Sequence, residues 1–162
     1  MADYEIRQVW PDEADAVAAL VNRAFKVESY FKRGDRTTPD GVTAMMRDGL
    51  FLALALDHGG ELVGSVFVRP SRPQGYFGML AIDPQRQGQG LGRRLIDAAE
   101  RHLAHAGCTH AEIHVVNLRE ELPPYYARLG YVTVGEVPFP KPDELSQPCH
   151  LIVMRKPLTS PS

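Results

Sequence analysis

The sequence predicts an α/β or α+β fold in which helices pack against a mixed β-sheet. Two observations predict this class. Strand and hairpin patterns dominate the first half of the chain, and a strand–helix–strand unit occupies its middle. A chain of 162 residues suits one domain with one hydrophobic core, so we expect residues 1–162 to form a single domain.

The chain opens with a predicted strand followed by a helix. Apolar and polar residues alternate over residues 4–9, which is typical of a strand. Pro11 and Asp12 are residues that favour a helix start, and the apolar residues after them recur at helical spacing. These apolar positions are Ala14, Val17, Ala18, Val21 and Phe25. We therefore expect an amphipathic helix to begin near residue 11.

Three further strands are predicted before the middle of the chain. Apolar stretches indicate strands at 51–57, 61–69 and 76–82. The segment His58-Gly59-Gly60 separates the first two of these strands and carries the glycines typical of a tight turn. These two strands should therefore form a hairpin.

A long amphipathic helix is predicted over residues 90–106. Its apolar residues form one stripe, while charged residues occupy the opposite face. The stripe consists of Leu91, Leu95, Ala98, Ala99 and Leu103. Gly107 is expected to end the helix, because glycine readily adopts the backbone conformation that follows a last helical turn. We expect the apolar stripe to pack against the sheet.

The last third of the chain adds strands and one short helix. We expect strands at 111–116, 130–134 and 150–155, a helix at 120–128, a loop at 137–148 and a frayed tail at 157–162. The first of these strands follows the long helix directly, which completes the strand–helix–strand unit.

Composition and charge restrict the classes of function. The 18 Lys and Arg residues and 20 Asp and Glu residues give a formal net charge of -2, which argues against a nucleic-acid partner. The longest hydrophobic stretch, residues 51–56, is too short to cross a bilayer. Residues 1–5 lack the basic and then apolar pattern of a signal peptide. We therefore expect a cytoplasmic protein without a membrane partner.

Histidine and cysteine side chains cluster in one segment of the sequence. They are His102, His105, Cys108, His110 and His114. The segment crosses from a helix through a turn into a strand, and its spacing fits no standard zinc pattern. Neither of the two cysteines, Cys108 and Cys149, belongs to a CxxC pair. We expect no metal site and two free thiols.

The most informative segment joins the strand at 76–82 to the helix at 90–106. It contains Gln87-Gly88-Gln89-Gly90-Leu91-Gly92, in which every second residue is glycine. Glycine lets the backbone adopt positive φ and lets a ligand approach the main chain. The first amides of a helix lack internal acceptors and lie at the positive end of the helix dipole. A phosphate or pyrophosphate is therefore the expected ligand of this turn.

Two well-known phosphate-binding motifs do not fit this turn. Its GxGxG pattern differs from the GxGxxG of dinucleotide-binding proteins, and the chain contains no GxxxxGK[ST] sequence. The pattern Q-x-x-G-x-G matches at every fixed position. The segments Leu80-Ala81-Ile82-Asp83-Pro84 and Tyr125-Tyr126-Ala127-Arg128-Leu129-Gly130-Tyr131 accompany it, with Asn117 between them. In this combination the chain resembles the GNAT superfamily of acyl-CoA-dependent N-acyltransferases.

The resemblance implies a more specific fold and a co-substrate. It implies a GNAT-like mixed, mostly antiparallel sheet of six to seven strands, flanked by about four helices and splayed between its fourth and fifth strands. It also implies acetyl-CoA, whose pyrophosphate would rest on the glycine turn while its pantetheine arm pairs with the preceding strand. The cofactor-binding positions carried over are Leu80, Ala81, Ile82, Gln87, Gly88, Gln89, Gly90, Leu91, Gly92, Arg93, Asn117 and Tyr126.

The resemblance also implies direct attack of an amine on the thioester. Tyr126 matches the family tyrosine that donates a proton to the departing thiolate, and a phenol is a competent donor at neutral pH. The position where some members carry a Glu base holds Tyr76 here. Glu28, His114 or a chain of water molecules could accept the proton. Glu28 could equally be a solvated loop carboxylate, and His114 could be a packed strand residue.

The acceptor pocket is expected between residues 28–36 and 139–150. Their mixture of aromatic and charged side chains suits a primary amine of a small molecule or of an amino-acid-like acceptor. The amine could instead belong to a protein or to an aminoacyl-tRNA. A non-catalytic acyl-CoA-binding module is a third alternative, against which Tyr126 argues. The resemblance also allows a homodimer.

Overall fold

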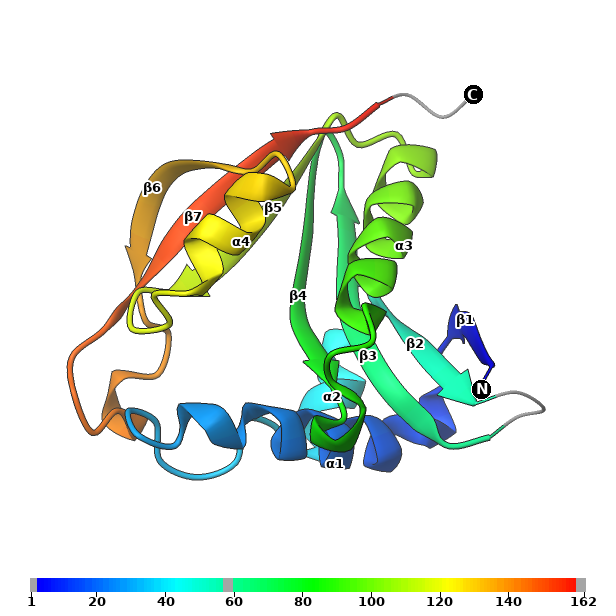
Figure 1. Ribbon diagram of the computed structural model, residues 1–162, viewed down its shortest axis with the longest axis horizontal. Helices are drawn as coiled ribbons and strands as arrows, with labels where there is room; N and C mark the ends of the chain where they lie inside the picture. Colours follow the sequence, from blue (N-terminus) through cyan, green and yellow to red (C-terminus); the bar gives the residue numbers. More distant parts are fainter. Residues whose placement is uncertain (1–2, 57–59, 160–162) are drawn as a thin grey trace.

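A single mixed sheet of seven strands forms the centre of the molecule (Figure 1). The computed structural model describes residues 3–56 and 60–159. The strand order across the sheet is β1-β2-β3-β4-β5-β7-β6. The strands are β1 (Tyr4–Gln8), β2 (Leu50–Leu56), β3 (Leu62–Ser71), β4 (Gln74–Ile82), β5 (His110–Val116), β6 (Val132–Pro138) and β7 (His150–Pro157). The β4–β5 pair is parallel and all other neighbours are antiparallel. The sheet is therefore mixed and mostly antiparallel, as the resemblance implied.

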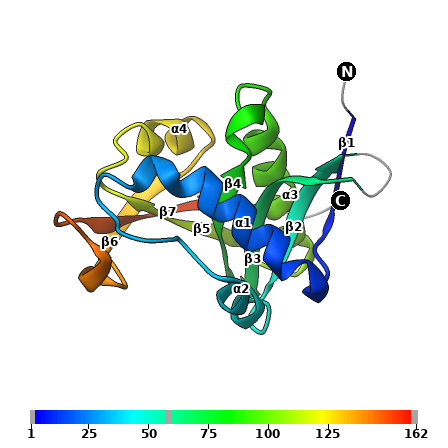
Figure 2. The ribbon, with the colours of Figure 1, turned by 90° about the horizontal axis from the view of Figure 1, so that it is seen from below.

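Helices cover both faces of the sheet (Figure 2). The α-helices of the described chain are α1 (Ala14–Ala24), α2 (Pro39–Met45), α3 (Leu91–His105) and α4 (Leu122–Arg128). Short 3₁₀ turns are η1 (Pro11–Glu13), η2 (Phe25–Glu28), η3 (Pro84–Arg86) and η4 (Pro142–Glu144). One core layer lies under α1 and α2, and the other lies under α3 and α4. None of the helices between residues 3 and 159 is long and apolar enough to cross a membrane.

Most predicted elements are confirmed within a few residues, but α2 was missed. This helix has seven residues, only one of which, Val42, is buried, so it lacks the apolar stripe that reveals longer helices. Its start does carry a sequence signal. Thr38 accepts a hydrogen bond from Gly41 N at 3.0 Å, and Pro39 occupies the first helical position.

The predicted ends of the last two strands are wrong. β6 begins two residues later than predicted and continues to Pro138, into the segment predicted to be a loop. β7 includes Pro157, and Leu158 N donates to Thr109 O at 2.8 Å, so the frayed tail does not begin at residue 157. Both strands are longer than predicted because they pair with segments that are distant in the sequence. The residues of a strand do not by themselves reveal such pairing. Of the predicted turn at 58–60, only Gly60 falls within the described residues.

The sheet splays between β4 and β5, as the resemblance implied. The two strands pair only where Gln74–Tyr76 meets His110–Glu112. Beyond Tyr76, β4 pairs with β3 alone, while the rest of β5 pairs with β7 alone. The sheet therefore opens into a V, which Figure 1 shows between β4 and the β5–β7 ribbon. The backbone edges that face each other across this opening have no strand partner.

A β-bulge in β4 lies on the wall of this opening. The β3–β4 register shifts between Phe67, which pairs with Gly78, and Ser65, which pairs with Ala81. Two residues of β4, Met79 and Leu80, consequently lie opposite a single residue of β3. Met79 has φ 54°. A positive φ at a residue other than glycine is rare and strained, so the surrounding structure must hold it.

Candidate active site

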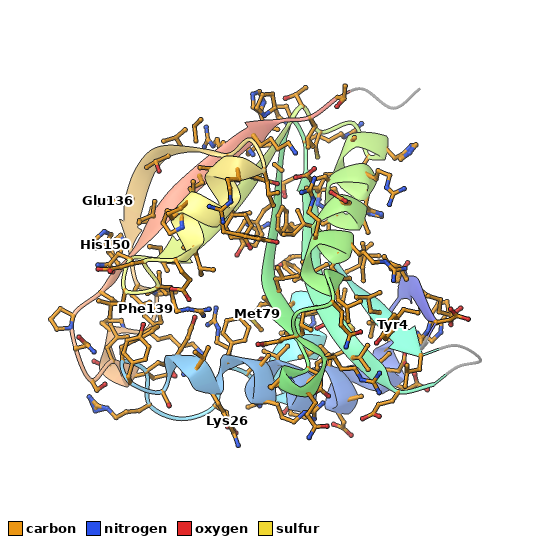
Figure 3. The ribbon with its side chains drawn as sticks, viewed as in Figure 1. Tyr4, Lys26, Met79, Glu136, Phe139 and His150 are labelled. Carbon is orange, nitrogen blue, oxygen red and sulfur yellow. The ribbon has the colours of Figure 1, made fainter. Side chains whose placement is uncertain are left out.

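A cavity of about 920 Å³ occupies the opening between the splayed strands. The residues that line it come from η2, β4, the glycine turn and the start of α3, β5, α4 and the segment after β6. Figure 3 shows Met79 on the β4 side of this opening and Phe139 on the opposite side. Segments far apart in the sequence thus meet around one space.

The glycine turn lines one end of the cavity. Asp83 Oδ1 accepts a hydrogen bond from Gln85 N at 3.0 Å and so shapes the η3 turn that precedes the glycines. Gly88 and Gly90 have φ of 84° and 74°, and an added Cβ at either would meet nothing within 4 Å. Backbone conformation, not crowding, therefore favours glycine at both positions.

The start of α3 is open to a ligand. Gly90 is the residue before the helix, and no side chain caps the helix start. The first amides of α3 therefore have no side-chain acceptor within the described chain, and they lie at the positive end of the helix dipole. The predicted phosphate-binding residues that line the cavity are Gln87, Gly88, Gly90, Leu91 and Gly92. Leu80 and Ile82 line it as well.

Four of the predicted cofactor-binding residues are not among those lining the cavity. Ala81 packs into the core under α1, and the side chain of Gln89 accepts a hydrogen bond from Tyr4 Oη at 2.9 Å. Arg93 pairs with Asp97 on the exposed face of α3. Asn117 Oδ1 accepts a hydrogen bond from His150 N at 2.8 Å, which ties the end of β5 to the start of β7.

Tyr126 lies on α4 with its side chain on the cavity wall. It is 8% exposed, and its ring contacts Tyr125 and Tyr131 edge-on at centroid distances of 5.2 and 5.7 Å. Burial raises the pKa of Tyr126, and the neighbouring Tyr125 raises it further. The phenol therefore keeps its proton at neutral pH and can act as a donor.

Glu28 is the last residue of η2 and also lines the cavity. It is 8% exposed, so it is not a solvated loop carboxylate. Its Oε2 accepts a hydrogen bond from Arg119 Nη1 at 3.0 Å. Burial raises the pKa of Glu28, against the opposing charges of Arg36, Arg119 and Lys32. The carboxylate is therefore more basic than an exposed one.

His114 also reaches the cavity, from β5. Its Nε2 lies 2.8 Å from Glu112 Oε2, and its ring meets Tyr76 edge-on at 5.2 Å. Glu112 is held in turn by Arg155 Nε at 2.8 Å. Burial raises the pKa of Glu112, but the hydrogen bonds from Arg155 and His114 outweigh it, so the pKa falls overall. An ionised Glu112 thus orients the imidazole.

Tyr76 and Arg36 complete the wall, and sequence analysis gave neither a role. Burial raises the pKa of Tyr76, and Arg69 lies over its ring at 4.7 Å. Arg36 lies over the Phe25 ring at 5.2 Å. Its Nε is one of two buried side-chain polar atoms without a hydrogen-bond partner in the described chain. No sequence motif marks Arg36, although it lies in a segment predicted to flank the acceptor.

The two segments predicted to flank the acceptor pocket do contact each other. Lys32 and Leu145 form an isolated antiparallel bridge, and Arg33 N donates to Glu144 O at 2.7 Å. Lys32 Nζ lies 2.8 Å from Glu144 Oε1. Within residues 3–56 and 60–159, no group of three or more His, Cys, Asp or Glu side chains is arranged so that it could hold a metal ion.

Comparison with known proteins gives a consistent result. The model of the acetyltransferase (GNAT) domain family matches residues 24–141. A mycothiol acetyltransferase of Propionibacterium freudenreichii subsp. shermanii is 30% identical over 131 residues, which cover 76% of this chain and 41% of that protein. The chain therefore spans about two fifths of the length of this relative.

Solved structures share the fold over nearly the whole chain. The ribosomal-protein-S18-alanine N-acetyltransferase from Escherichia coli has a TM-score of 0.77 at 16% identity, covering 99% of this chain and 97% of that one. The yncA protein of Salmonella typhimurium, solved with its cofactor acetyl-CoA, has a TM-score of 0.73 at 16% identity, covering 99% and 96%. At these identities the likeness concerns the fold alone.

Proposed function

The chain belongs to the GNAT acetyltransferase family, and we propose that it transfers an acetyl group from acetyl-CoA to a primary amine of a small or amino-acid-like molecule. One observation carries this proposal: the uncapped start of α3 opens into the same cavity as the buried phenol of Tyr126. The first feature suits a pyrophosphate, and the second suits a departing thiolate.

The residues present fit acetyl-CoA. The backbone amides of Gln87, Gly88, Gly90, Leu91 and Gly92 would hold its pyrophosphate, with Gln89 and Arg93 flanking the turn. The free edge of β4 at Leu80, Ala81 and Ile82 would pair with the pantetheine arm as an added strand, because β5 has already diverged there. Asn117 lies at the end of β5 with its Oδ1 held by His150 N, so its side-chain NH2 group would be left to contact the arm. Bound acetyl-CoA supplies a thioester carbonyl carbon as the electrophile.

Tyr126 would act as the general acid. The amine nitrogen forms a bond to the thioester carbon, the carbon–sulfur bond breaks, and the thiolate takes the phenolic proton of Tyr126. Burial raises the pKa of Tyr126, so the phenol is still protonated when the carbon–sulfur bond breaks.

The attacking amine must lose a proton, and we propose Glu28 as the base with His114 as its competitor. Burial makes Glu28 more basic, although Arg119 already binds one of its oxygens. His114 has a carboxylate partner in Glu112, the arrangement that orients catalytic imidazoles. The pH dependence of kcat/KM distinguishes the two candidates. In the wild type, kcat/KM should fall at low pH because the base becomes protonated. This fall should disappear in Glu28→Gln if Glu28 is the base, and in His114→Asn if His114 is the base.

The relatives named mycothiol acetyltransferase act on a small molecule by their name, but this chain spans only about two fifths of the first of them. A protein or aminoacyl-tRNA amine, a non-catalytic binding role and a homodimer remain alternatives to be tested.

The proposal is tested by acetyl-CoA binding and by release of free CoA. A ligand at about 100 times its Kd stabilises the folded state by about 2.7 kcal/mol. For a domain of this size we expect the Tm to rise by about 5–10 °C. A panel of amines, read by free thiol, should then reveal turnover. A Tm unchanged at saturating acetyl-CoA would contradict the site, and binding without turnover on any amine would favour the non-catalytic alternative.

A further inference from the structure

Arg36 is the feature of the cavity that the proposed chemistry leaves unused. Its side chain lines the cavity beside Glu28 and Tyr76, on the wall that η2 and the segment after it provide. The ring of Phe25, 5.2 Å from the guanidinium carbon, supports it from one side. Its Nε is buried and has no hydrogen-bond partner in the described chain. A buried donor without a partner is costly, so proteins seldom keep one unless a ligand completes it.

The carboxylates nearest to Arg36 already have other partners. Glu28 accepts its hydrogen bond from Arg119, and Glu144 pairs with Lys32 at 2.8 Å. The positive charge of Arg36 nevertheless lowers the pKa of both carboxyl groups. Within residues 3–56 and 60–159, no ion pair shorter than 4.0 Å engages the guanidinium itself. Arg36 is thus a cation held at the cavity without a partner anion.

Arg36, Tyr76 and Tyr126 all line the same cavity. A small molecule whose amine lies near Tyr126 can therefore extend within this cavity toward Arg36. A guanidinium presents a planar fork of donors that matches a carboxylate, and a single unpaired cation balances a single negative charge.

We propose that Arg36 binds a carboxylate group of the acceptor, so that the substrate is an amine that also carries a carboxylate, as amino acids do. This inference rests on the proposed function, because it concerns the acceptor end of the same cavity. Arg36 is then a specificity-determining residue that holds the acceptor, while proton transfer belongs to the residues near the thioester.

The test compares matched acceptors on the wild-type chain and on Arg36→Gln. Each amino acid is paired with its amide and with the amine that lacks the carboxylate, and free CoA is measured with acetyl-CoA saturating. We expect kcat/KM for the amino acid to be about tenfold or more above that for the amide and for the amine. The amide and the amine lack the carboxylate that would form a charged hydrogen bond with Arg36. Arg36→Gln should remove this preference through KM of the amino acid. Loss of the Arg36 charge also raises the pKa of Glu28 for every acceptor, so the preference is measured as the ratio of kcat/KM between the amino acid and the two partners that lack a carboxylate.

Two controls keep the result specific. Lys26→Gln removes a cation from the same segment, but Lys26 is exposed and points away from the cavity (Figure 3), so its kinetics should match the wild type. The Tm of Arg36→Gln without ligand measures how much the contact of the guanidinium with the Phe25 ring contributes to the fold. An unchanged Tm rise with acetyl-CoA shows that the cofactor site is intact.

Three results would overturn the inference while leaving the proposed function standing. One is equal turnover of amino acids and their amides. Another is an amino-acid preference that Arg36→Gln leaves unchanged. The third is a preference for an amine that carries a phosphate over one that carries a carboxylate. By contrast, absence of CoA release with every amine would contradict the proposed function itself.

Discussion

At the scale of single residues, burial decides what the side chains at the cavity can do. Tyr126 and Glu28 are both 8% exposed, and burial raises the pKa of each. For the phenol this keeps a proton available to a thiolate, and for the carboxylate it creates a stronger base. The sequence predicted the tyrosine from its motif, but it left Glu28 open between a solvated and a buried position.

Replacement of Tyr126 by Phe should reduce turnover and leave binding intact. Loss of a general acid lowers rates by about 10²–10⁴-fold, so kcat should fall within that range while the acetyl-CoA-induced rise in Tm persists. Tyr131→Phe is the matched control. It removes a hydroxyl that donates to Glu100 at 2.7 Å outside the cavity, so it should lower the Tm and spare kcat. Unchanged turnover in Tyr126→Phe would remove Tyr126 from the mechanism.

Replacement of Glu28 by Gln should stabilise the fold in a pH-dependent way. The pKa of Glu28 is raised above its ordinary value of 4.5, so the neutral form is favoured in the folded state. The wild type therefore loses stability as pH rises from 4.5 through the folded pKa, and Gln cannot lose it. The difference in Tm between Glu28→Gln and wild type should grow from pH 4 to pH 8. A difference that shrinks over this range would show that Arg119 dominates the site.

At the scale of elements, the turn between β4 and α3 joins a strand edge to a helix start. η3 and the positive φ of Gly88 and Gly90 reverse the chain so that the amides of α3 face the cavity end of β4. The sequence predicted this turn because glycine spacing is a local property. It missed α2, since seven residues with one buried side chain give no periodic signal.

Replacement of Gly90 by Ala should weaken acetyl-CoA binding. With φ at 74° an L-residue is strained by about 1 kcal/mol or more, although the new methyl group meets no atom within 4 Å. We expect a Tm lower by a few degrees and a Kd for acetyl-CoA raised several-fold, measured by calorimetry. Gly135→Ala is the control, because Gly135 has neither positive φ nor a close neighbour. Equal effects of the two substitutions would argue against a special role for the turn.

At the scale of the whole molecule, two parts of one sheet are joined at three residue pairs between β4 and β5. The cavity lies where this pairing stops, so a ligand that spans it would contact both parts. The backbone edge of β4 beyond Tyr76 is the surface on which such a ligand could add hydrogen bonds.

Hydrogen exchange should detect this added pairing. Amides of β4 between Phe77 and Ile82 that face the opening should exchange faster than those bonded to β3, and acetyl-CoA should slow them. Amides of β2, which is paired on both sides, should not respond. A second, separate pocket is lined by residues that include Glu136, Cys149 and His150. Protection confined to this pocket would contradict binding of acetyl-CoA between β4 and β5.

The sequence alone determined the features that depend on neighbours along the chain. These are the strand and helix periods, the glycine turn and the tyrosine motif, each of which is a short pattern with a local physical cause. The resemblance carried by those patterns also indicated the splayed sheet and four helices. The side-chain partners of Asn117 and Gln89 could not be predicted, because both are set by groups at least 33 residues away in the chain.

Tertiary structure decided which side chains share the cavity and what charge each one keeps. In the folded chain Glu28 is hydrogen-bonded to Arg119, which is 91 residues away in the sequence, and Glu144 forms an ion pair with Lys32. Within the described residues Arg36 has no anionic partner. Burial and pairing depend on how distant segments pack, and no local pattern encodes them. The sequence therefore identified where acetyl-CoA is expected to bind, whereas only the folded chain revealed the unpaired guanidinium that suggests its acceptor.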